Sequence, residues 1–196
     1  GGDGAVPITK SITISGDGTA ASILSAGTNG IIVNAGVNDV VTIRNVSING
    51  VETGLNGIRF LAGGELHVEN CTLAGFTGQG IDFQPSGASG LFVSRTSISN
   101  ANAGAINVVP GAAGSAVASL NEVTMQGNAR GLRAEGGATV VVRDSGASGN
   151  NLNGFVAIAW DRPVDLTLEN SVASRNGAAG IHAGQLSTVR ISNTLV

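Results

Sequence analysis

The feature that most limits the fold of this chain is an internal repeat of about 25 residues. Seven times a glycine precedes a short apolar segment, at intervals of 27, 23, 24, 27, 23 and 26 residues. The seven glycines are Gly30, Gly57, Gly80, Gly104, Gly131, Gly154 and Gly180. A repeat of this length is typical of solenoids, in which each unit packs only on its neighbours.

Two further columns run in step with the glycines. The segments of the second column end on a polar residue and span 41–45, 66–70, 91–95, 118–122, 140–144, 166–170 and 189–193. A third short segment follows each of these at once, as at 46–48 and 71–73. Apolar and polar residues alternate within the segments, so each is expected to be a strand with one buried face.

Composition narrows the choice of fold. The chain has 31 Gly, one Trp and no Tyr, and it is 42% hydrophobic with only 12% charged residues. A disordered chain would be less apolar, and a helical bundle would be poorer in glycine. We therefore predict an all-β fold: a single-stranded right-handed parallel β-helix of about 7–8 coils, with three short strands per coil. We expect one domain over residues 1–196, with an interior filled by Ala, Val, Ile and Leu rather than by rings.

One corner of each coil has a recognisable residue type. Asn is well suited to left-handed backbone conformations, and stacked Asn side chains can hydrogen-bond from coil to coil. We expect such a ladder at Asn45, Asn70, Asn170 and Asn193, interrupted in the middle coils by Arg95, Glu122 and Asp144. The residue after this corner belongs to an inward column of small side chains, which predicts that Cys71 is buried.

The stretches ITKSITISGDG at 8–18 and GTNGI at 27–31 resemble known sequences. They are similar to the pectate-lyase-like superfamily of right-handed parallel β-helix proteins, and closest to uncharacterised bacterial β-helix repeat proteins. The resemblance covers nearly the whole chain and implies the fold. It implies no single activity, because that superfamily includes lyases, hydrolases, epimerases, adhesins and inert scaffolds. It favours a secreted or cell-surface location in a bacterium.

The ends and the charge of the chain suggest which partners to expect. The chain begins directly at Gly1 and stops at Val196, without the polar caps that solenoids need, so we expect a fragment of a longer β-helix or self-association through uncapped ends. The net charge of −3 and the lack of a basic run argue against nucleic acid. The apolar runs are too short to cross a membrane.

The outward positions of the first strands form a ladder along the solenoid, which is where β-helix enzymes of the resembling superfamily keep their sites. One ladder is expected to consist of Ile32, Arg59, Asp82, Asn107, Arg133, Val156 and His182. A second, two residues further along each strand, is expected to consist of Asn34, Leu61, Gln84, Val109, Glu135, Ile158 and Gly184.

Two enzymatic reactions and one structural role are conceivable for these ladders. Glycoside hydrolysis needs two carboxyls about 5–5.5 Å or about 6.5–9.5 Å apart, whereas strand geometry puts Asp82 and Glu135 roughly 12 Å apart. A polysaccharide lyase would use Arg133 or Arg59 as the base beside Asp82, with Ca²⁺ held by several acids. Only Asp82 is acidic among Asp82, Gln84 and Asn107, so a salt-bridged Arg–Asp–Asn–Arg ladder without metal is the favoured interpretation.

The segment 159–165 is the one stretch that combines Trp, Pro and three charges. Strand parity turns Trp160 outward together with Val156 and Ile158, which indicates either a covered surface or a binding patch. Trp160 could stack on a sugar ring while Asp161 and Arg162 bond its hydroxyls. The alternative is that Trp160 packs over a loop or a neighbouring chain.

The remaining polar residues give weak signals. His182 and His67 are expected on the surface without partners, and Asp3 and Asp17 are expected to cap turns. No zinc-ligand spacing exists with two His and one Cys. The sequence thus favours a non-catalytic scaffold that binds polysaccharide, through the segment 160–162 and through Gln84, Asn107, Glu135 and His182. The alternative is a lyase that acts on an acidic glycan through Arg59, Asp82 and Arg133.

Overall fold

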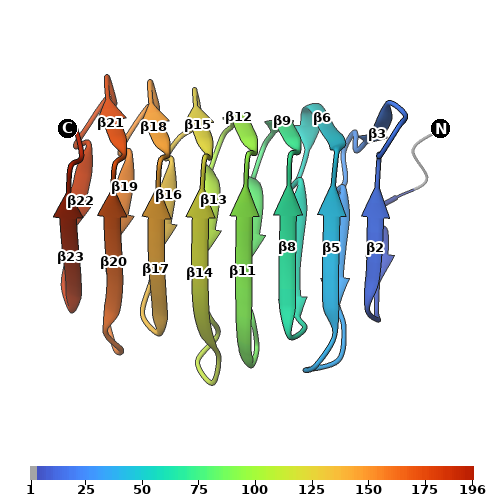
Figure 1. The fold of residues 1–196 in the computed structure, drawn as a ribbon, viewed down its shortest axis with the longest axis horizontal. Coiled ribbons are helices and arrows are strands. Elements are labelled where there is room, and N and C mark those ends of the chain that lie inside the picture. The colour runs from blue at the N-terminus through green and yellow to red at the C-terminus, as the bar shows by residue number, and fades with distance from the viewer. Residues whose placement is uncertain (1–3) are drawn as a thin grey trace.

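The structure, a computed structural model, describes residues 4–196 and is a parallel β-helix of three sheets (Figure 1). This confirms the predicted fold and coil number, while Asp3 lies outside the described residues. The first sheet contains β1 (Val6–Ile8), β4 (Ile31–Asn34), β7 (Ile58–Ala62), β10 (Gln79–Phe83), β13 (Gly104–Val108), β16 (Leu132–Ala134), β19 (Phe155–Ala157) and β22 (Ile181–Ala183).

The second and third sheets complete each coil. The second contains β2 (Ile12–Ser15), β5 (Val40–Arg44), β8 (Glu65–Glu69), β11 (Ala88–Ser94), β14 (Ser115–Asn121), β17 (Ala138–Arg143), β20 (Val164–Glu169) and β23 (Ser187–Ser192). The third contains β3 (Ala21–Leu24), β6 (Val46–Gly54), β9 (Thr72–Phe76), β12 (Ser97–Ala101), β15 (Thr124–Gln126), β18 (Gly146–Ser148) and β21 (Val172–Ser174). The described chain contains no helix long and apolar enough to cross a membrane.

The repeated glycine marks a close approach of backbones. A Cβ on Gly30 would lie 2.6 Å from the carbonyl oxygen of Gly57, and one on Gly57 would lie 2.6 Å from that of Gly80. Neither glycine has a positive φ, so contact with the next coil and not left-handed backbone requires glycine here. In one coil Ala105 takes this position, because Gly80 aligns with Ala105, and Gly104 lies one residue earlier.

The polar corner after the second sheet has the predicted left-handed backbone in each coil from β5 onward. Its seven residues have φ between 43° and 56°: Asn45, Asn70, Arg95, Glu122, Asp144, Asn170 and Asn193. The side-chain ladder is also confirmed at both ends and interrupted in the middle.

The bonds of this ladder run from coil to coil. The Nδ2 of Asn70 donates to the Oδ1 of Asn45 at 2.5 Å, and that of Asn193 donates to the Oδ1 of Asn170 at 2.8 Å. Asn45 in turn donates to Asp17, which also pairs with Arg44 at 2.6 Å. Hydrogen bonding with Ser15 and then with Asn45 and Arg44 lowers the pKa of Asp17 below its usual value. Asp17 therefore ends the ladder, which is more than the turn cap expected from the sequence.

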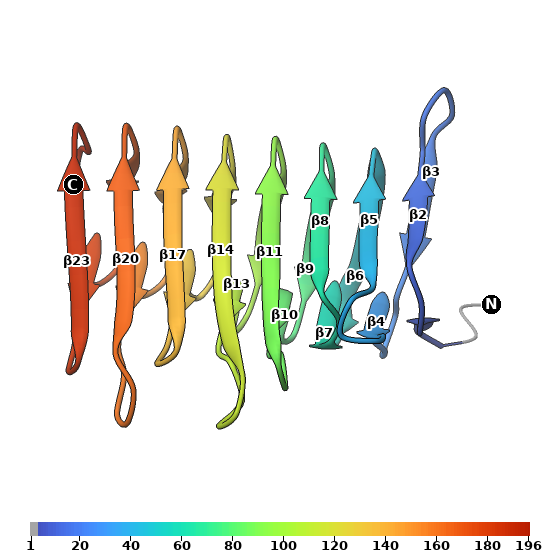
Figure 2. The same ribbon diagram turned by 60° about the horizontal axis from the view of Figure 1, so that its bottom comes forward.

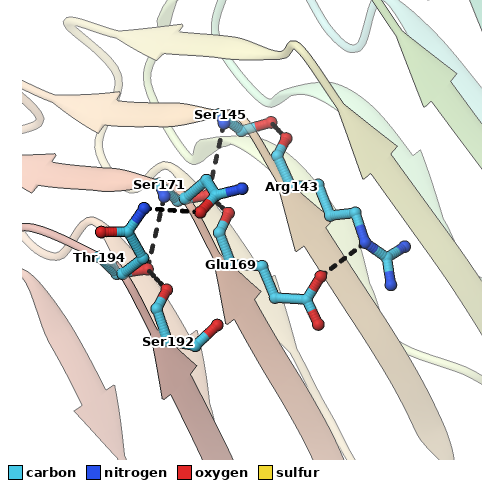
Figure 3. A network of polar contacts seen from close by, with 8 residues as sticks. Arg143, Ser145, Glu169, Ser171, Ser192 and Thr194 are labelled. Atoms are coloured by element: carbon cyan, nitrogen blue, oxygen red, sulfur yellow. Dashed lines mark hydrogen bonds and ion pairs between the residues drawn. The ribbon is translucent and has the colours of Figure 1, made fainter.

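The next column points inward and is partly made of hydroxyls (Figure 3). The Ser171 Oγ accepts from the Ser145 amide at 3.3 Å and donates to the Glu169 carbonyl at 2.8 Å. Thr194 repeats this arrangement one coil later, with its Oγ1 3.4 Å from the Ser171 amide. Cys71 lies in the same column and is 3% exposed, as predicted.

A second asparagine ladder lies inside the corner between the third and first sheets, and sequence reasoning missed it. Asn128 and Asn150 are 0% and 1% exposed. The Oδ1 of Asn150 accepts from the amide and Nδ2 of Asn128, at 3.0 and 3.2 Å. The Nδ2 of Asn150 donates to the Met125 carbonyl and to the Oδ1 of Asn176. These side chains satisfy backbone groups that the turn would otherwise leave buried and unpaired.

The interior is mostly aliphatic, but the expectation that it lacks rings was wrong. Phe60, Phe76, Phe83 and Phe155 are fully buried, and the rings of Phe60 and Phe83 stack with centroids 4.4 Å apart. Rings on adjacent coils can stack because the coil spacing is close to an aromatic stacking distance. Side chains at the two ends of the helix are more open, as with Ile12 at 42% and Ile191 at 52% exposed.

We predict that Asn150→Ala lowers the free energy of unfolding by about 1–3 kcal/mol, because it leaves the buried Asn128 amide without its acceptor. Urea denaturation followed by circular dichroism measures the change. Asn151→Ala is the matched control, since Asn151 is exposed and its side chain forms no hydrogen bond within residues 4–196. Equal destabilisation by both variants would contradict the proposed role of the inner ladder.

We also predict that the thiol of Cys71 resists labelling in the folded protein. Burial raises the pKa of this thiol above its ordinary value, and only the thiolate reacts readily. Ellman's reagent at neutral pH should label the native chain far more slowly than the chain in denaturant. A native rate equal to the denatured rate would show that the column around Cys71 is open.

Candidate functional site

The first-sheet ladder is assembled as the strand pairing predicts. Asp82 lies opposite Arg59 on one side and Asn107 on the other, and Asn107 lies opposite Arg133. Val156 and His182 continue the row. The second ladder departs from prediction at one place: a register shift after Val33 pairs Asn34 with Ala62 instead of Leu61.

Asp82 is the centre of this face and is only 5% exposed. Its Oδ1 accepts from the Nδ2 of Asn107 at 3.0 Å, and both of its oxygens lie near the Nε2 of Gln84, at 2.9 and 3.1 Å. The Nε of Arg59 lies 3.9 Å from its Oδ2. Two hydrogen-bond donors, Asn107 and Gln84, thus satisfy the one buried acid of the ladder, and the guanidinium of Arg59 lies nearby.

Arg133 is turned away from Asp82. Its guanidinium pairs with Glu135, which lies two residues later in the same coil, and not with Asn107 in the adjacent coil. The structure therefore brings together Arg59, Asp82, Gln84 and Asn107, with Arg133 and Glu135 as a separate ion pair. Within residues 4–196 the Nε atoms of Arg59 and Arg133 are buried and have no hydrogen-bond partner.

The outward apolar row is less exposed than strand parity suggested. Val156 is 5% exposed, and Ile158 is partly covered and lies against Gly184, where a Cβ would lie 2.6 Å from its Cγ1. His182 is exposed, as expected. Trp160 is 66% exposed and is the one large apolar side chain of this segment that reaches solvent.

The loop that carries Trp160 is fixed at both ends. The amide of Ala159 donates to the Gln185 carbonyl at 2.9 Å, and that of Val164 donates to the Leu186 carbonyl at 3.0 Å. The loop before β20 and the loop before β14 extend beyond the shorter turn before β17, which lies between them (Figure 2).

Arg162 joins these two long loops across the short turn. Its guanidinium donates to the carbonyls of Gly114 at 2.5 Å, Gly111 at 3.0 Å and Gly136 at 3.0 Å, with a longer contact to Pro110 at 3.4 Å. Gly137 leaves room for it, because a Cβ there would lie 2.7 Å from its Nη1. The guanidinium predicted to bind sugar hydroxyls is thus engaged with backbone carbonyls of two preceding coils, while the neighbouring Asp161 side chain is 73% exposed.

His67 has partners that the sequence did not suggest. Its Nε2 lies 2.8 Å from a carboxylate oxygen of Glu65, and its ring stacks on Phe92 of the next coil, with centroids 4.8 Å apart. The expectation that His67 lacks a partner was wrong. Within residues 4–196, no three His, Cys, Asp or Glu side chains gather in an arrangement that could hold a metal ion.

The chain matches a known protein family. A family model described as "Right handed beta helix region" matches residues 29–196. No curated protein sequence matches the chain. The matched region contains every residue discussed above as a candidate site.

We predict that Arg162→Ala lowers the free energy of unfolding by about 2 kcal/mol, because a cation that donates to several carbonyls contributes more than a neutral donor. Urea denaturation measures the loss, and the emission of Trp160 should shift toward longer wavelength as its loop loosens. Arg130→Ala is the control, since that partly exposed side chain forms no hydrogen bond or ion pair within the described region. Unchanged stability of Arg162→Ala would refute the bridging role.

Proposed function

The chain belongs to the right-handed β-helix family, and from this premise we propose that it is a non-catalytic scaffold that binds a polysaccharide through Trp160. The observation that carries the proposal is a large aromatic side chain that is 66% exposed on a loop held by backbone hydrogen bonds at both ends and by Arg162. Exposing an indole to water is unfavourable, and fixing it in place lowers the entropy lost on binding.

The surroundings of Trp160 suit a sugar ring. The flat apolar face of an indole packs against the C–H face of a pyranose, and polar groups beside it bind the ring hydroxyls. Asp161 supplies an exposed carboxylate at this place. Glu135, at the end of the neighbouring strand, is partly exposed and paired with Arg133. Arg162 holds the loop in place through its bonds to backbone carbonyls and need not touch the ligand.

Lyase chemistry is the second candidate, favoured by two buried Nε atoms that have no hydrogen-bond partner within residues 4–196: that of Arg59, beside Asp82, and that of Arg133, beside Asn107. Two contacts argue against it. Arg133 is paired with Glu135, and Arg59 lies beside Asp82, so each guanidinium already has a carboxylate of the protein as its neighbour. Asp82 also has most of its acceptor capacity in use by Asn107 and Gln84.

We predict that soluble oligosaccharides change the fluorescence of Trp160 in a saturable way. The chain has one Trp and no Tyr, so the emission reports this residue alone. Trp160→Ala should abolish retention in affinity gels that contain the polysaccharide, and Trp160→Phe should retain part of it. Val117→Ala, which removes another exposed apolar side chain on the second sheet, is the control. Wild-type retention of Trp160→Ala would overturn the proposal.

The wild-type protein and its variants also test the lyase alternative. Polygalacturonate and alginate are incubated with the protein, with and without Ca²⁺, while ultraviolet absorbance monitors unsaturated product. The scaffold proposal expects no product. Product formation that Arg133→Ala abolishes would establish the lyase instead.

A further inference from the structure

One coil carries an insertion at the corner between the third and first sheets. In the pairing of β6 with β9, Asn49 lies opposite Ala74 and Gly54 lies opposite Phe76. The four residues 50–53 therefore occupy a place that the next coil fills with Gly75 alone. The coil after that fills it with Asn100 alone, since Ser99 and Ala101 lie opposite Ala74 and Phe76.

The insertion has an unfavourable backbone. Val51 and Glu52 follow each other with φ of 51° and 59°, in the left-handed region that a β-branched residue rarely adopts. Little in the fold compensates for this, because Val51 is 49% exposed and its amide bonds only to the nearby Oδ1 of Asn49, at 2.8 Å. Strained segments of this kind are concentrated at functional sites.

Two adjoining depressions lie on either side of Glu52, with volumes of about 350 and 380 Å³. Both are lined by Glu52 and Asn100; Asn49 lines one and Asn102 the other. Within residues 4–196 the side chains of Glu52, Asn100 and Asn102 form no hydrogen bond and no ion pair. Three polar side chains that have no partner within the described residues thus line the two depressions.

The residues that line the two depressions indicate which kind of ligand can bind there. No Lys or Arg side chain is present to hold an anion, and a single carboxylate is a poor ligand set for a divalent cation. Carboxamides both donate and accept, and a carboxylate accepts from two donors, which together match adjacent hydroxyl groups. We propose that the insertion at 50–53 forms a second binding site that takes the hydroxyl groups of a neutral sugar.

This inference rests on the proposed function, since it assigns the class of glycan. The insertion precedes β7 at one edge of the first sheet, whereas Trp160 follows β19 at the opposite edge. Four strand spacings separate β7 from β19, or roughly 19 Å along the axis. The two sites are therefore distinct, and a long chain that touches both binds more tightly than a short one.

Two variants are designed to remove the second site and to keep the fold. In one, Gly replaces the four residues 50–53, as Gly75 does in the next coil. In the other, Asn100→Gly removes an amide from a left-handed position that Gly75 and Gly127 also occupy in adjoining coils. Arg175→Gly is the matched control, because Arg175 is an exposed left-handed residue of this same corner, far from the depressions.

Affinity electrophoresis in gels with neutral xylan, galactan or β-glucan, and with polygalacturonate, provides the test. We expect both variants to weaken retention by a neutral glycan roughly threefold to tenfold, as the loss of one or two hydrogen bonds would. Arg175→Gly should match the wild type, and the Trp160 fluorescence response to short oligosaccharides should stay unchanged in all three.

The outcomes separate the two proposals. Wild-type retention of both variants, together with loss in Trp160→Ala, would overturn the second site and leave the proposed function standing. Failure of every glycan to retain the wild type would overturn both. Calcium binding measured by calorimetry and lost in Glu52→Gln, without any change in glycan retention, would replace the sugar by a cation.

Discussion

Alignment of successive coils depends above all on the left-handed corner after the second sheet. From β5 onward, one residue per coil adopts φ between 43° and 56°, whether it is Asn, Arg, Glu or Asp. This conformation is costly for residues other than Gly and Asn, so the turn is imposed by the packing on both sides of it. Strands of the second sheet end at the corner and those of the third begin beyond it. The left-handed corner residues therefore help to set the register in which the polar and apolar side chains of successive coils align.

Sequence periodicity predicted the fold because strand pairing in a solenoid repeats with the sequence. It also predicted the order of Arg59, Asp82, Asn107 and Arg133, which follows from pairing alone. It did not predict the inner ladder of Asn128, Asn150 and Asn176, because turn asparagines look alike whether they face the solvent or the interior. The sequence also showed the repeated glycines. The structure shows that glycine is needed there because the backbone of the next coil comes too close for a Cβ, and not because the turn is left-handed.

Atomic partners within the candidate site were harder to predict than positions. Arg133 pairs with Glu135 and not with the neighbouring Asn107, a choice that strand pairing alone does not determine. Arg162 bonds to carbonyls 26 to 52 residues away, and backbone acceptors carry no residue type to search for. The register shift after Val33 likewise depends on the geometry of one turn. The exposure of Trp160 was correctly expected from strand parity, whereas the burial of Val156 was not.

The bridge formed by Arg162 has a consequence for how the molecule comes apart. Solenoids are usually treated as chains of units coupled only to their nearest neighbours, so that they can fray coil by coil from an end. Arg162 bonds both to the coil before its own and to the second coil before it. A coupling of that range makes three coils open and close together. The part of the solenoid that holds Trp160 should therefore behave as a single cooperative block.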